Sequence, residues 1–521
     1  MRTLEIILVF LIVGAAICLL MGRWPRITRL LVSFALLTAI AHAIIEGAHW
    51  QMIPAYAATG ILCLAAWKSG GDQRRLQGIT AWPALLLASV SILFSFLLPM
   101  FHLPEPTGPY PVGTSILYFK DSARTEDAAP AGGSARELLV QLWYPAQPSL
   151  NRFARYREPQ ETNAFSSYQS VILTNSRRDA PIAITGAPFP VIIFNHAWRG
   201  RRTNDTFLIE ELASHGYIVA SIDHTYNASQ VAFPDGRVVH GVASNEIDAP
   251  DTSTTERVRA IWDKELVKWV ADQRFVLDRL AQMNRSAGSP WFGRLDTNNA
   301  GALGHSFGGA SATAVCAADP RIHASVNMDG WFFGAIRARG PNQPLLVIIA
   351  TTAQGGETSD PNAKVGAALD AADLVDVKTS LRNFGGYLLS VKGAEHEDFT
   401  DQPLISPLRM LSHRGALPAS RIQEITRTYV LAFFDMTLRG EDPAVFHPRS
   451  APYTEASLEA WQVNNSAIHP LISSEGRRES IPLATILPLM LSPAANWLDC
   501  FSVSIASSSN HNQSESKIAL F

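Results

Sequence analysis

A serine in a glycine-rich turn is the residue of this sequence with the clearest chemical potential. The run Gly304-His-Ser-Phe-Gly308 fits the pattern G-x-S-x-G, with a strand-like segment at 300–303 before it and a helix-compatible segment at 310–318 after it. At a sharp turn from strand to helix the serine hydroxyl is held above the sheet edge, and the flanking glycines remove side chains that would collide. We therefore predict that Ser306 is a nucleophile. A purely structural glycine-rich turn is the alternative.

A serine hydroxyl needs a general base, and the base needs an acid that orients it. On this kind of turn the order along the chain is serine, then Asp or Glu, then His, each just past a strand. Asp329 directly follows the strand-like run 324–328 and is the predicted acid, while Asp360, after the next strand, is the alternative. His396 follows the strand-like run 387–391 and is the predicted base. Three acidic residues surround it, which favours its protonated form and raises its pKa.

The negative charge that develops on the substrate oxygen requires two hydrogen-bond donors. The N–H of Phe307, directly after the serine, is the first predicted donor. The loop after the strand-like run 191–195 supplies the second, and we predict the N–H of Trp198, with a packing role as the alternative. Trp331 and Phe332 lie beside the predicted acid and are candidates to line a substrate pocket, although core packing also suits them.

The elements that must position these residues alternate between strands and helices. Strand-like runs cover 138–144, 191–195, 217–222, 300–303, 324–328, 345–350 and 387–391, and helical patterns cover 203–215, 255–283 and 420–438. Such alternation is typical of a mostly parallel sheet with helices on both faces. In these sheets the chemistry lies at the carboxyl ends of the strands. The sequence therefore predicts an α/β-hydrolase fold.

The N-terminal hundred residues are far more apolar than the rest. Hydrophobic residues make up 47% of the chain and charged residues 17%, and the excess lies in four stretches at 4–21, 27–46, 51–67 and 79–101. Each approaches the roughly 20 residues that cross a bilayer as a helix. Arginine and lysine gather in the first and third connecting loops and are absent from the second. The positive-inside bias then predicts a multi-pass cell-membrane protein whose catalytic domain lies on the extracytoplasmic side.

Three polar residues near the end of the second apolar stretch share one helix face. His42, Glu46 and His49 are spaced i, i+4 and i+7. A small metal site is one interpretation, and polar residues where a helix reaches water is the other. We favour the second, because three loosely spaced ligands without a fourth are weak evidence. We therefore predict neither a metal nor a cofactor.

These observations divide the 521-residue chain into four parts. They are a transmembrane region of about four helices at 1–102, a proline-rich linker at 103–112, a catalytic domain at 113–446, and a partly disordered C-terminal extension at 447–521. A net charge of −3 without a basic cluster argues against a nucleic-acid partner. Four cysteines without a C-x-x-C pair indicate no disulfide framework.

Several linked motifs resemble one known family. They are Phe194-Asn-His-Ala-Trp198, the run 212–224, Gly304-His-Ser-Phe-Gly-Gly-Ala310, Met328-Asp-Gly-Trp-Phe-Phe333 and His396-Glu-Asp-Phe399. Together they resemble the plasma and type II platelet-activating factor acetylhydrolases over about residues 135–440. This sequence departs from the family pattern in two ways. It has Ala197 where that family usually has glycine, and its apolar N-terminal region is not part of the family's core.

The resemblance implies an α/β-hydrolase whose triad is Ser306, Asp329 and His396. It favours Asp329 over Asp360, and it implies hydrolysis of short or oxidised acyl chains of phospholipids without a metal. The expected function is thus that of a membrane-anchored serine esterase whose substrate is a lipid or small-molecule ester. The sequence does not assign an oligomeric state. A broad carboxylesterase or polyester hydrolase on the same triad is the second hypothesis. A non-catalytic membrane scaffold is the third.

Overall fold

The computed structural model describes residues 1–22, 24–67, 73–129, 133–242, 255–351, 361–408, 415–447 and 452–461. Asp360, the alternative acid, lies outside the described residues, as does 462–521, which is most of the predicted C-terminal extension.

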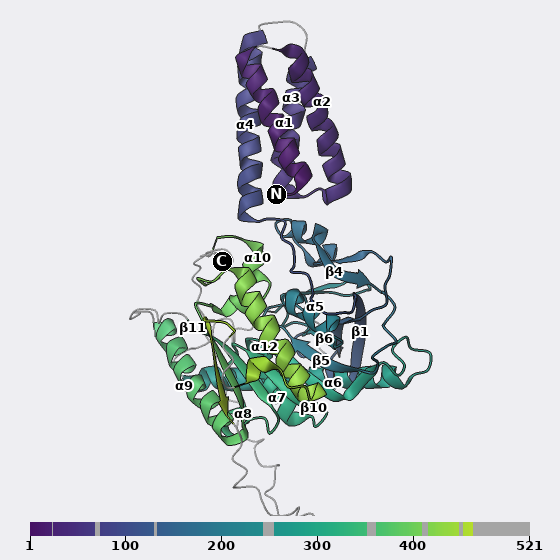
Figure 1. The fold of residues 1–521 in the computed structure, drawn as a ribbon, viewed down its shortest axis with the longest axis vertical. Helices are drawn as coiled ribbons and strands as arrows, with labels where there is room; N and C mark the ends of the chain where they lie inside the picture. The colour runs from purple at the N-terminus through teal and green to yellow at the C-terminus, as the bar shows by residue number, and fades with distance from the viewer. Residues whose placement is uncertain are drawn as a thin grey trace, which may run out of the picture. The chain divides into compact units, whose positions relative to one another are not determined.

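Four helices form the N-terminal part (Figure 1). They are α1 (Thr3–Met21), α2 (Pro25–Ala41), α3 (Ile53–Trp67) and α4 (Gln73–Leu97), with the π-helical turn η1 (His42–Gly47) and the 3-10 turn η2 (Trp50–Met52) between α2 and α3. Small buried residues line their shared core and let the helix backbones approach closely: Ala15, Ala16, Ala35, Ala55, Ala58, Ala81, Ala84 and Ala88. Large apolar side chains such as Phe10 and Leu64, each 74% exposed, cover the outside.

Within the described residues, the segments Thr3–Met21, Pro25–Gly47 and Ile79–Leu97 are long and apolar enough to cross a membrane. These three correspond to the first, second and fourth predicted spans. The third predicted span is a helix, α3, but its 15 residues are fewer than a typical crossing needs.

The main part is built on an eleven-stranded sheet. Its order is β13 (Ala456–Trp461), β12 (Gly386–Lys392), β11 (Leu345–Thr351), β10 (Ile322–Met328), β9 (Leu295–His305), β5 (Phe189–Asn195), β6 (Ile218–Asp223), β2 (Ala135–Pro145), β1 (Val112–Thr125), β4 (Leu173–Arg178) and β3 (Phe153–Arg155). The strands from β6 to β12 in this order run parallel, and β2 and β13 pair with their two ends antiparallel. A separate hairpin joins β7 (Gln230–Ala232) and β8 (Val238–His240).

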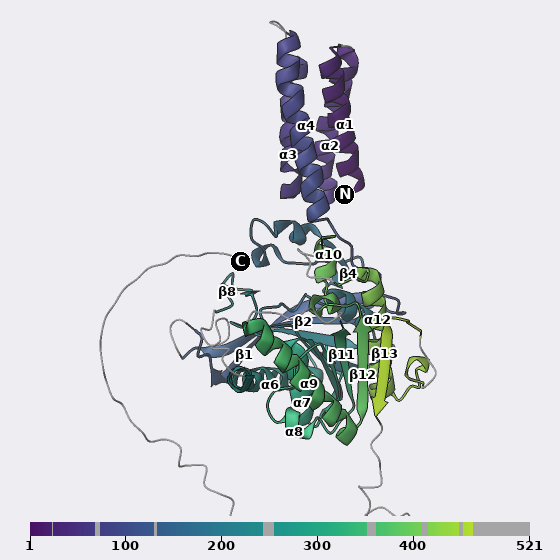
Figure 2. The same cartoon turned by 90° about the vertical axis from the view of Figure 1, so that its left-hand side faces the viewer.

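Helices cover both faces of this sheet (Figures 1 and 2). Ile192 and Phe194 of β5 pack with α5 (Thr206–Ser214) and α12 (Ala419–Arg439). Val191 and Ile193, the alternate residues, pack with α6 (Thr255–Arg285) and α7 (Phe307–Ala318). The continuous apolar run of β5 is therefore explained, since parallel strands are buried on both faces. Helix α9 (Pro361–Phe384) extends the second layer.

Short helices complete the described chain. They are η3 (Pro159–Glu161), η4 (Ser167–Val171), α8 (Ile336–Arg339), η5 (His396–Phe399), α10 (Gln402–Ile405) and η6 (Ala444–Phe446).

The structure contains every strand and helix that the sequence predicted in the main part, and it adds the strands β1, β3, β4, β7, β8 and β13, the helix α9 and several short helices. The predicted linker packs against α5: the N–H groups of Gly108 and Tyr110 lie 3.0 Å from the hydroxyl and the carbonyl of Ser214, respectively. Strand β13 lies within the segment predicted as an extension, so the sheet continues to Trp461.

Candidate active site

The predicted nucleophile lies at the turn between β9 and α7. Ser306 has φ 56° and ψ −126°, a strained backbone conformation that residues other than glycine rarely adopt. Its N–H donates to the carbonyl of Met328 at 2.8 Å, and its own carbonyl accepts from the N–H groups of Gly309 and Ala310 at 2.9 and 3.1 Å. These bonds on both sides hold the strained turn, while the serine itself remains partly exposed.

Close backbone packing explains the two glycines of the motif. A Cβ on Gly304 would lie 2.3 Å from the backbone of Gly308, and one on Gly308 would lie 2.1 Å from the carbonyl oxygen of Asn195. Both distances are far below van der Waals contact. The turn is therefore pressed against the end of β5, where the loop with the second predicted oxyanion donor begins.

The predicted acid and base are in direct contact. Asp329 follows β10, beside β9 in the sheet, and its Oδ2 lies 2.7 Å from Nδ1 of His396. Its Oδ1 accepts from the N–H of Ala350 at 2.9 Å, which fixes the carboxylate. Because the carboxylate only accepts, His396 carries its proton on Nδ1 and leaves Nε2 as an acceptor in the neutral ring.

Protonation of His396 depends on two opposing effects. Burial disfavours the charged ring, but the hydrogen bond and the negative charge of Asp329, together with the charge of Glu397, raise the pKa of His396 above its ordinary value. Among the described residues no hydrogen bond joins His396 to the Ser306 hydroxyl. In unliganded active sites this contact is often long and tightens when substrate binds.

His305, the variable residue of the motif, ties the nucleophile turn to the histidine loop. Its Nε2 lies 2.8 Å from the carbonyl oxygen of His396 and must donate the hydrogen bond. The two imidazole rings are 4.5 Å apart. Burial and the neighbouring His396 hold the pKa of His305 well below its ordinary value, so the ring is neutral. Sequence reasoning missed this role, because nothing local relates His305 to a loop about ninety residues later.

The backbone N–H groups of both predicted oxyanion donors, Phe307 and Trp198, make no hydrogen bond among the described residues that would prevent them from binding an oxyanion. The N–H of Phe307 is at the first position of α7, where helical N–H groups have no intrahelical acceptor. Neither this group nor the N–H of Trp198 donates a hydrogen bond within the described part of the chain. The two side-chain rings lie 5.9 Å apart. Bonds from Arg199 N–H to Asn227 O (3.0 Å) and from Gly200 N–H to Ala197 O (2.7 Å) hold the Trp198 loop.

The two predicted pocket residues differ in exposure. Trp331 is partly exposed and donates from Nε1 to Asp370 at 2.7 Å. Phe332 is 1% exposed and belongs to the core. Next to the nucleophile turn, aromatic rings form a cluster of Trp198, Trp262, Trp269, Phe307 and Phe333, and the Trp331 ring lies 6.2 Å from that of Phe333. Trp331 is therefore the better placed of the two to contact a substrate.

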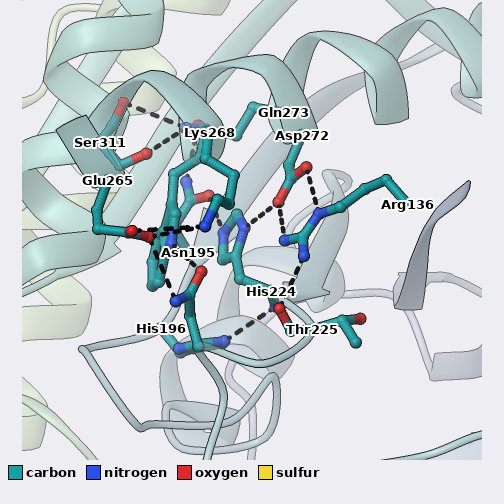
Figure 3. Close-up of polar contacts among 12 residues, drawn as sticks. Arg136, Asn195, His196, His224, Thr225, Glu265, Lys268, Asp272, Gln273 and Ser311 are labelled. Atoms are coloured by element: carbon teal, nitrogen blue, oxygen red, sulfur yellow. Dashed lines mark hydrogen bonds and ion pairs between the residues drawn. The ribbon is translucent and has the colours of Figure 1, made fainter. Parts of the chain in front are cut away.

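A buried polar network lies next to the loop that contains Trp198, the second predicted oxyanion donor (Figure 3). The Asp272 carboxylate on α6 lies 2.6 Å from Arg136 Nη2 and 2.9 Å from His224 Nδ1. His224 Nε2 lies 3.1 Å from Asn195 Oδ1, and Asn195 donates to Gln273 at 2.8 Å.

Burial raises the pKa of the Asp272 carboxyl, but Arg136 and His224 outweigh it and hold that pKa well below its ordinary value. Gln273 continues the network to the Ser311 carbonyl in α7 at 3.2 Å. The network thus joins the end of β5 to the nucleophile helix. Sequence reasoning missed Asp272, because its helical pattern gives no sign of a partner 136 residues earlier.

The chain is similar to known proteins. The model of the family described as platelet-activating factor acetylhydrolase, isoform II, matches residues 98–442. The platelet-activating factor acetylhydrolase of Cavia porcellus is 23% identical over 378 residues, which cover 64% of this chain and 78% of that protein. A probable 1-alkyl-2-acetylglycerophosphocholine esterase of Arthroderma benhamiae is 23% identical over 393 residues, covering 68% of this chain and 93% of that protein.

A solved structure is also similar. The ferulic acid esterase of Streptomyces cinnamoneus superimposes with a TM-score of 0.54 and 29% identity, covering 69% of this chain and 99% of that one. The large, mostly parallel sheet fits an α/β-hydrolase. The resemblance inferred from the sequence motifs is confirmed: the chain belongs to the platelet-activating factor acetylhydrolase, isoform II, family and is a carboxylic ester hydrolase.

Proposed function

We propose that this protein is a membrane-anchored serine esterase that hydrolyses short or modified acyl chains of phospholipid-like substrates. Its triad is Ser306, His396 and Asp329. The observation that carries the proposal is the 2.7 Å contact of Asp329 with His396 beside the strained Ser306 turn. Family membership argues against the third hypothesis, a non-catalytic scaffold.

In this mechanism His396 Nε2 takes the proton of the Ser306 hydroxyl as its oxygen attacks the ester carbonyl. The N–H groups of Phe307 and Trp198 bind the oxyanion, and each such donor lowers the barrier by about 3–4 kcal/mol. His396 then gives its proton to the leaving alcohol. A water molecule, activated by the same ring, releases the acyl group from Ser306. Asp329 keeps the ring in one tautomer and stabilises its charged form.

A series of phospholipids that differ only at the sn-2 position tests the substrate class. Against detergent-purified protein we expect kcat/KM to fall steadily from a 2-acetyl to a long 2-acyl chain. The names of two related proteins support this choice: one is an acetylhydrolase, and the other is a probable 1-alkyl-2-acetylglycerophosphocholine esterase. A flat profile over chain length would contradict it.

A broad esterase that accepts bulky aromatic esters is the second candidate. It is favoured by the aromatic cluster beside Ser306 and by the similarity to a ferulic acid esterase. It predicts a larger kcat/KM for methyl ferulate than for the 2-acetyl lipid, and a selective loss on the ferulate in Trp331→Ala. Phe292→Ala is the matched control, because Phe292 is 51% exposed and has no place in the aromatic cluster.

Membrane anchoring rests on the apolar segments, and the extracytoplasmic placement of the catalytic domain rests on the arginine and lysine of the first and third loops. We expect the full-length protein to stay in the membrane fraction after an alkaline carbonate wash. In intact cells, an impermeant reagent should label a tag placed after Phe521. Release by carbonate would contradict the anchor, and labelling only after lysis would contradict the placement.

A further inference from the structure

A second cluster of reactive side chains lies among the N-terminal helices, away from the esterase residues in sequence. Glu5 of α1, His42 at the start of η1 and His49 before η2 are all buried, at 0%, 0% and 6% exposure. One ligand atom from each lies within 4.8 Å of the others. The sequence pattern contained the two histidines, but Glu5 is supplied by a different helix and only the fold brings it to them.

The spacing of these atoms suits ligands arranged around a central ion. His49 Nε2 lies 3.1 Å and His42 Nε2 lies 3.5 Å from the same oxygen, Oε1 of Glu5. A tetrahedral site with bonds near 2.0–2.1 Å separates its ligand atoms by about 3.3 Å. The His42 distance is long for a hydrogen bond, but both distances fit the edges of such a tetrahedron.

A second carboxylate lies beside His42. Glu46 Oε2 is 3.7 Å from His42 Nε2 and 3.7 Å from Arg2 Nε, is itself buried, and accepts no hydrogen bond among the described residues. The other oxygen of this carboxylate accepts from the N–H of Leu4 at 3.1 Å, which fixes its orientation. A carboxylate oxygen that is buried without a donor loses its hydration, and a bound cation compensates that loss.

The outer nitrogens of both histidines have partners of the kind that metal ligands use. His42 Nδ1 lies 2.6 Å from the Tyr56 hydroxyl, and His49 Nδ1 lies 2.9 Å from Gln51 Oε1. The Gln51 amide is fixed in this orientation, because its Nε2 donates to the carbonyl of Leu98 at 3.2 Å. Such partners orient metal-bound imidazoles and set their tautomer.

Both rings converge on one oxygen of Glu5. His49 Nε2 and His42 Nε2 both face Oε1, while the opposite nitrogen of each ring is held by its own partner, Gln51 or Tyr56. One bound cation would account for this convergence.

Arg2 is the positive charge already nearby. Its Nε lies 2.8 Å from Glu5 Oε1 and its Nη2 lies 3.4 Å from His42 Nε2. The guanidinium also donates to the carbonyl oxygens of Glu46 and Gly47. It can keep those two bonds while Glu5 binds an ion, but its charge then opposes the ion. Replacing Arg2 by glutamine should therefore tighten metal binding.

We propose that Glu5, His42, Glu46 and His49 form a binding site for one divalent transition metal ion, for which Zn²⁺ is the best match. Imidazole and carboxylate ligands suit Zn²⁺, and four protein ligands make a closed, structural site. Such an ion would fasten the start of α1 to the connection between α2 and α3. This site is independent of the esterase triad and its chemistry.

The test uses the full-length protein in detergent, stripped with a chelator, desalted and titrated with Zn²⁺ while bound metal and thermal unfolding are followed. We expect one tightly held equivalent and a higher unfolding temperature. Glu5→Gln and His49→Gln should lose that equivalent, and Gln51→Leu should weaken binding about 10–100-fold. The exposed His102→Gln and the active-site His396→Gln should both keep it.

Two results would overturn the proposal. One is wild-type protein that holds no stoichiometric Zn²⁺, which would leave Glu5, Arg2 and the two histidines as a hydrogen-bonded cluster without an ion. The other is unchanged binding in Glu5→Gln. If the ligand variants do not fold, Co²⁺ added to the wild type decides instead. Intense visible d–d bands of a tetrahedral nitrogen–oxygen site support the proposal, and the weak spectrum of aqueous Co²⁺ contradicts it.

Discussion

His396 has to be uncharged to accept the Ser306 proton, yet its surroundings favour the charged ring. Burial lowers its pKa, and the hydrogen bond to Asp329, the charge of Asp329 and the charge of Glu397 raise it, with a net shift above 6.5. Esterase activity should therefore be low in acid and rise with pH through this raised pKa. The acid limb of the kcat/KM profile reports that value for the free enzyme.

Glu397→Gln should move this acid limb to lower pH, because it removes one of the negative charges that stabilise the imidazolium. The measurement is kcat/KM for a short p-nitrophenyl ester from acid to neutral pH. Glu395→Gln is the matched control: Glu395 is adjacent to His396 in sequence, but it is not among the largest contributors to the pKa shift of His396. An equal shift in both variants, or none in Glu397→Gln, would contradict this electrostatic account.

At the scale of residues, the local sequence was enough to place Ser306 and Asp329 directly after strands, and His396 in the loop that follows β12. Their catalytic roles remain predictions. The role of His305 could not be predicted, because it depends on how two distant loops meet. The burial of Phe332 could not be predicted either, since a Trp-Phe-Phe run suits a pocket and a core equally well.

At the scale of elements, the buried Asp272 connects helix α6 to strands β1 and β2. Its carboxylate pairs with Arg136 at 2.6 Å and with Arg124 at 2.8 Å. Removing one charge of a buried pair leaves the partner uncompensated and typically costs about 3–5 kcal/mol. Asp272→Asn should lower the free energy of unfolding by this order, as measured by chemical denaturation.

The control for Asp272→Asn is Asp278→Asn on the same helix. Asp278 also pairs with an arginine, Arg321, at 2.8 Å, but its side chain is 64% exposed. An exposed pair contributes about 1 kcal/mol or less. Equal destabilisation by the two substitutions would show that the buried network does not hold α6 against β2.

Sequence patterns predicted the parallel strands and the long amphipathic helices, because their apolar runs are continuous or have a clear helical period. Strands outside the parallel core of the sheet were missed for a physical reason. β1, between β2 and β4, alternates buried and exposed residues irregularly and carries Lys120, Asp121 and Arg124, and the edge strand β13 is largely exposed. Strands with few apolar residues resemble loops in a single sequence.

At the scale of the whole molecule, several buried carboxyl groups make stability depend on pH. Burial raises the pKa of Glu210, Asp373 and Asp401 to about 7. The ordinary values are 4.5 for Glu and 3.8 for Asp, so the folded state binds these protons more tightly than the unfolded state does. Their stabilising contribution is complete below about pH 4 and is lost as the pH rises to about 7.

Asp373→Asn should reduce this loss of stability between about pH 4 and 7, because asparagine accepts the Phe332 N–H without ionising. The free energy of unfolding in denaturant, measured across this range in both proteins, gives the difference. Asp442→Asn is the control, since that side chain is 89% exposed. Identical pH dependence in wild type and Asp373→Asn would show that Asp373 ionises normally in the folded protein.

Also at this scale, hydropathy predicted an N-terminal group of helices, and three of them have the length and composition to cross a membrane. Helix α3 is shorter than the pattern suggested, because part of that apolar stretch forms η2. Hydropathy could not relate Glu5 to His42 and His49, since their proximity comes from the packing of α1 against the connection between α2 and α3.

The identity of the nucleophile is tested most directly by comparing wild-type protein with Ser306→Ala, using hydrolysis of a short p-nitrophenyl ester and covalent labelling by a fluorophosphonate probe. We predict a loss in kcat on the order of a millionfold, with labelling abolished at the same time. Ser286→Ala, at an exposed serine, should keep both activity and labelling. A folded Ser306→Ala protein that still turns over the ester and still reacts with the probe would contradict the assignment of Ser306 as the nucleophile.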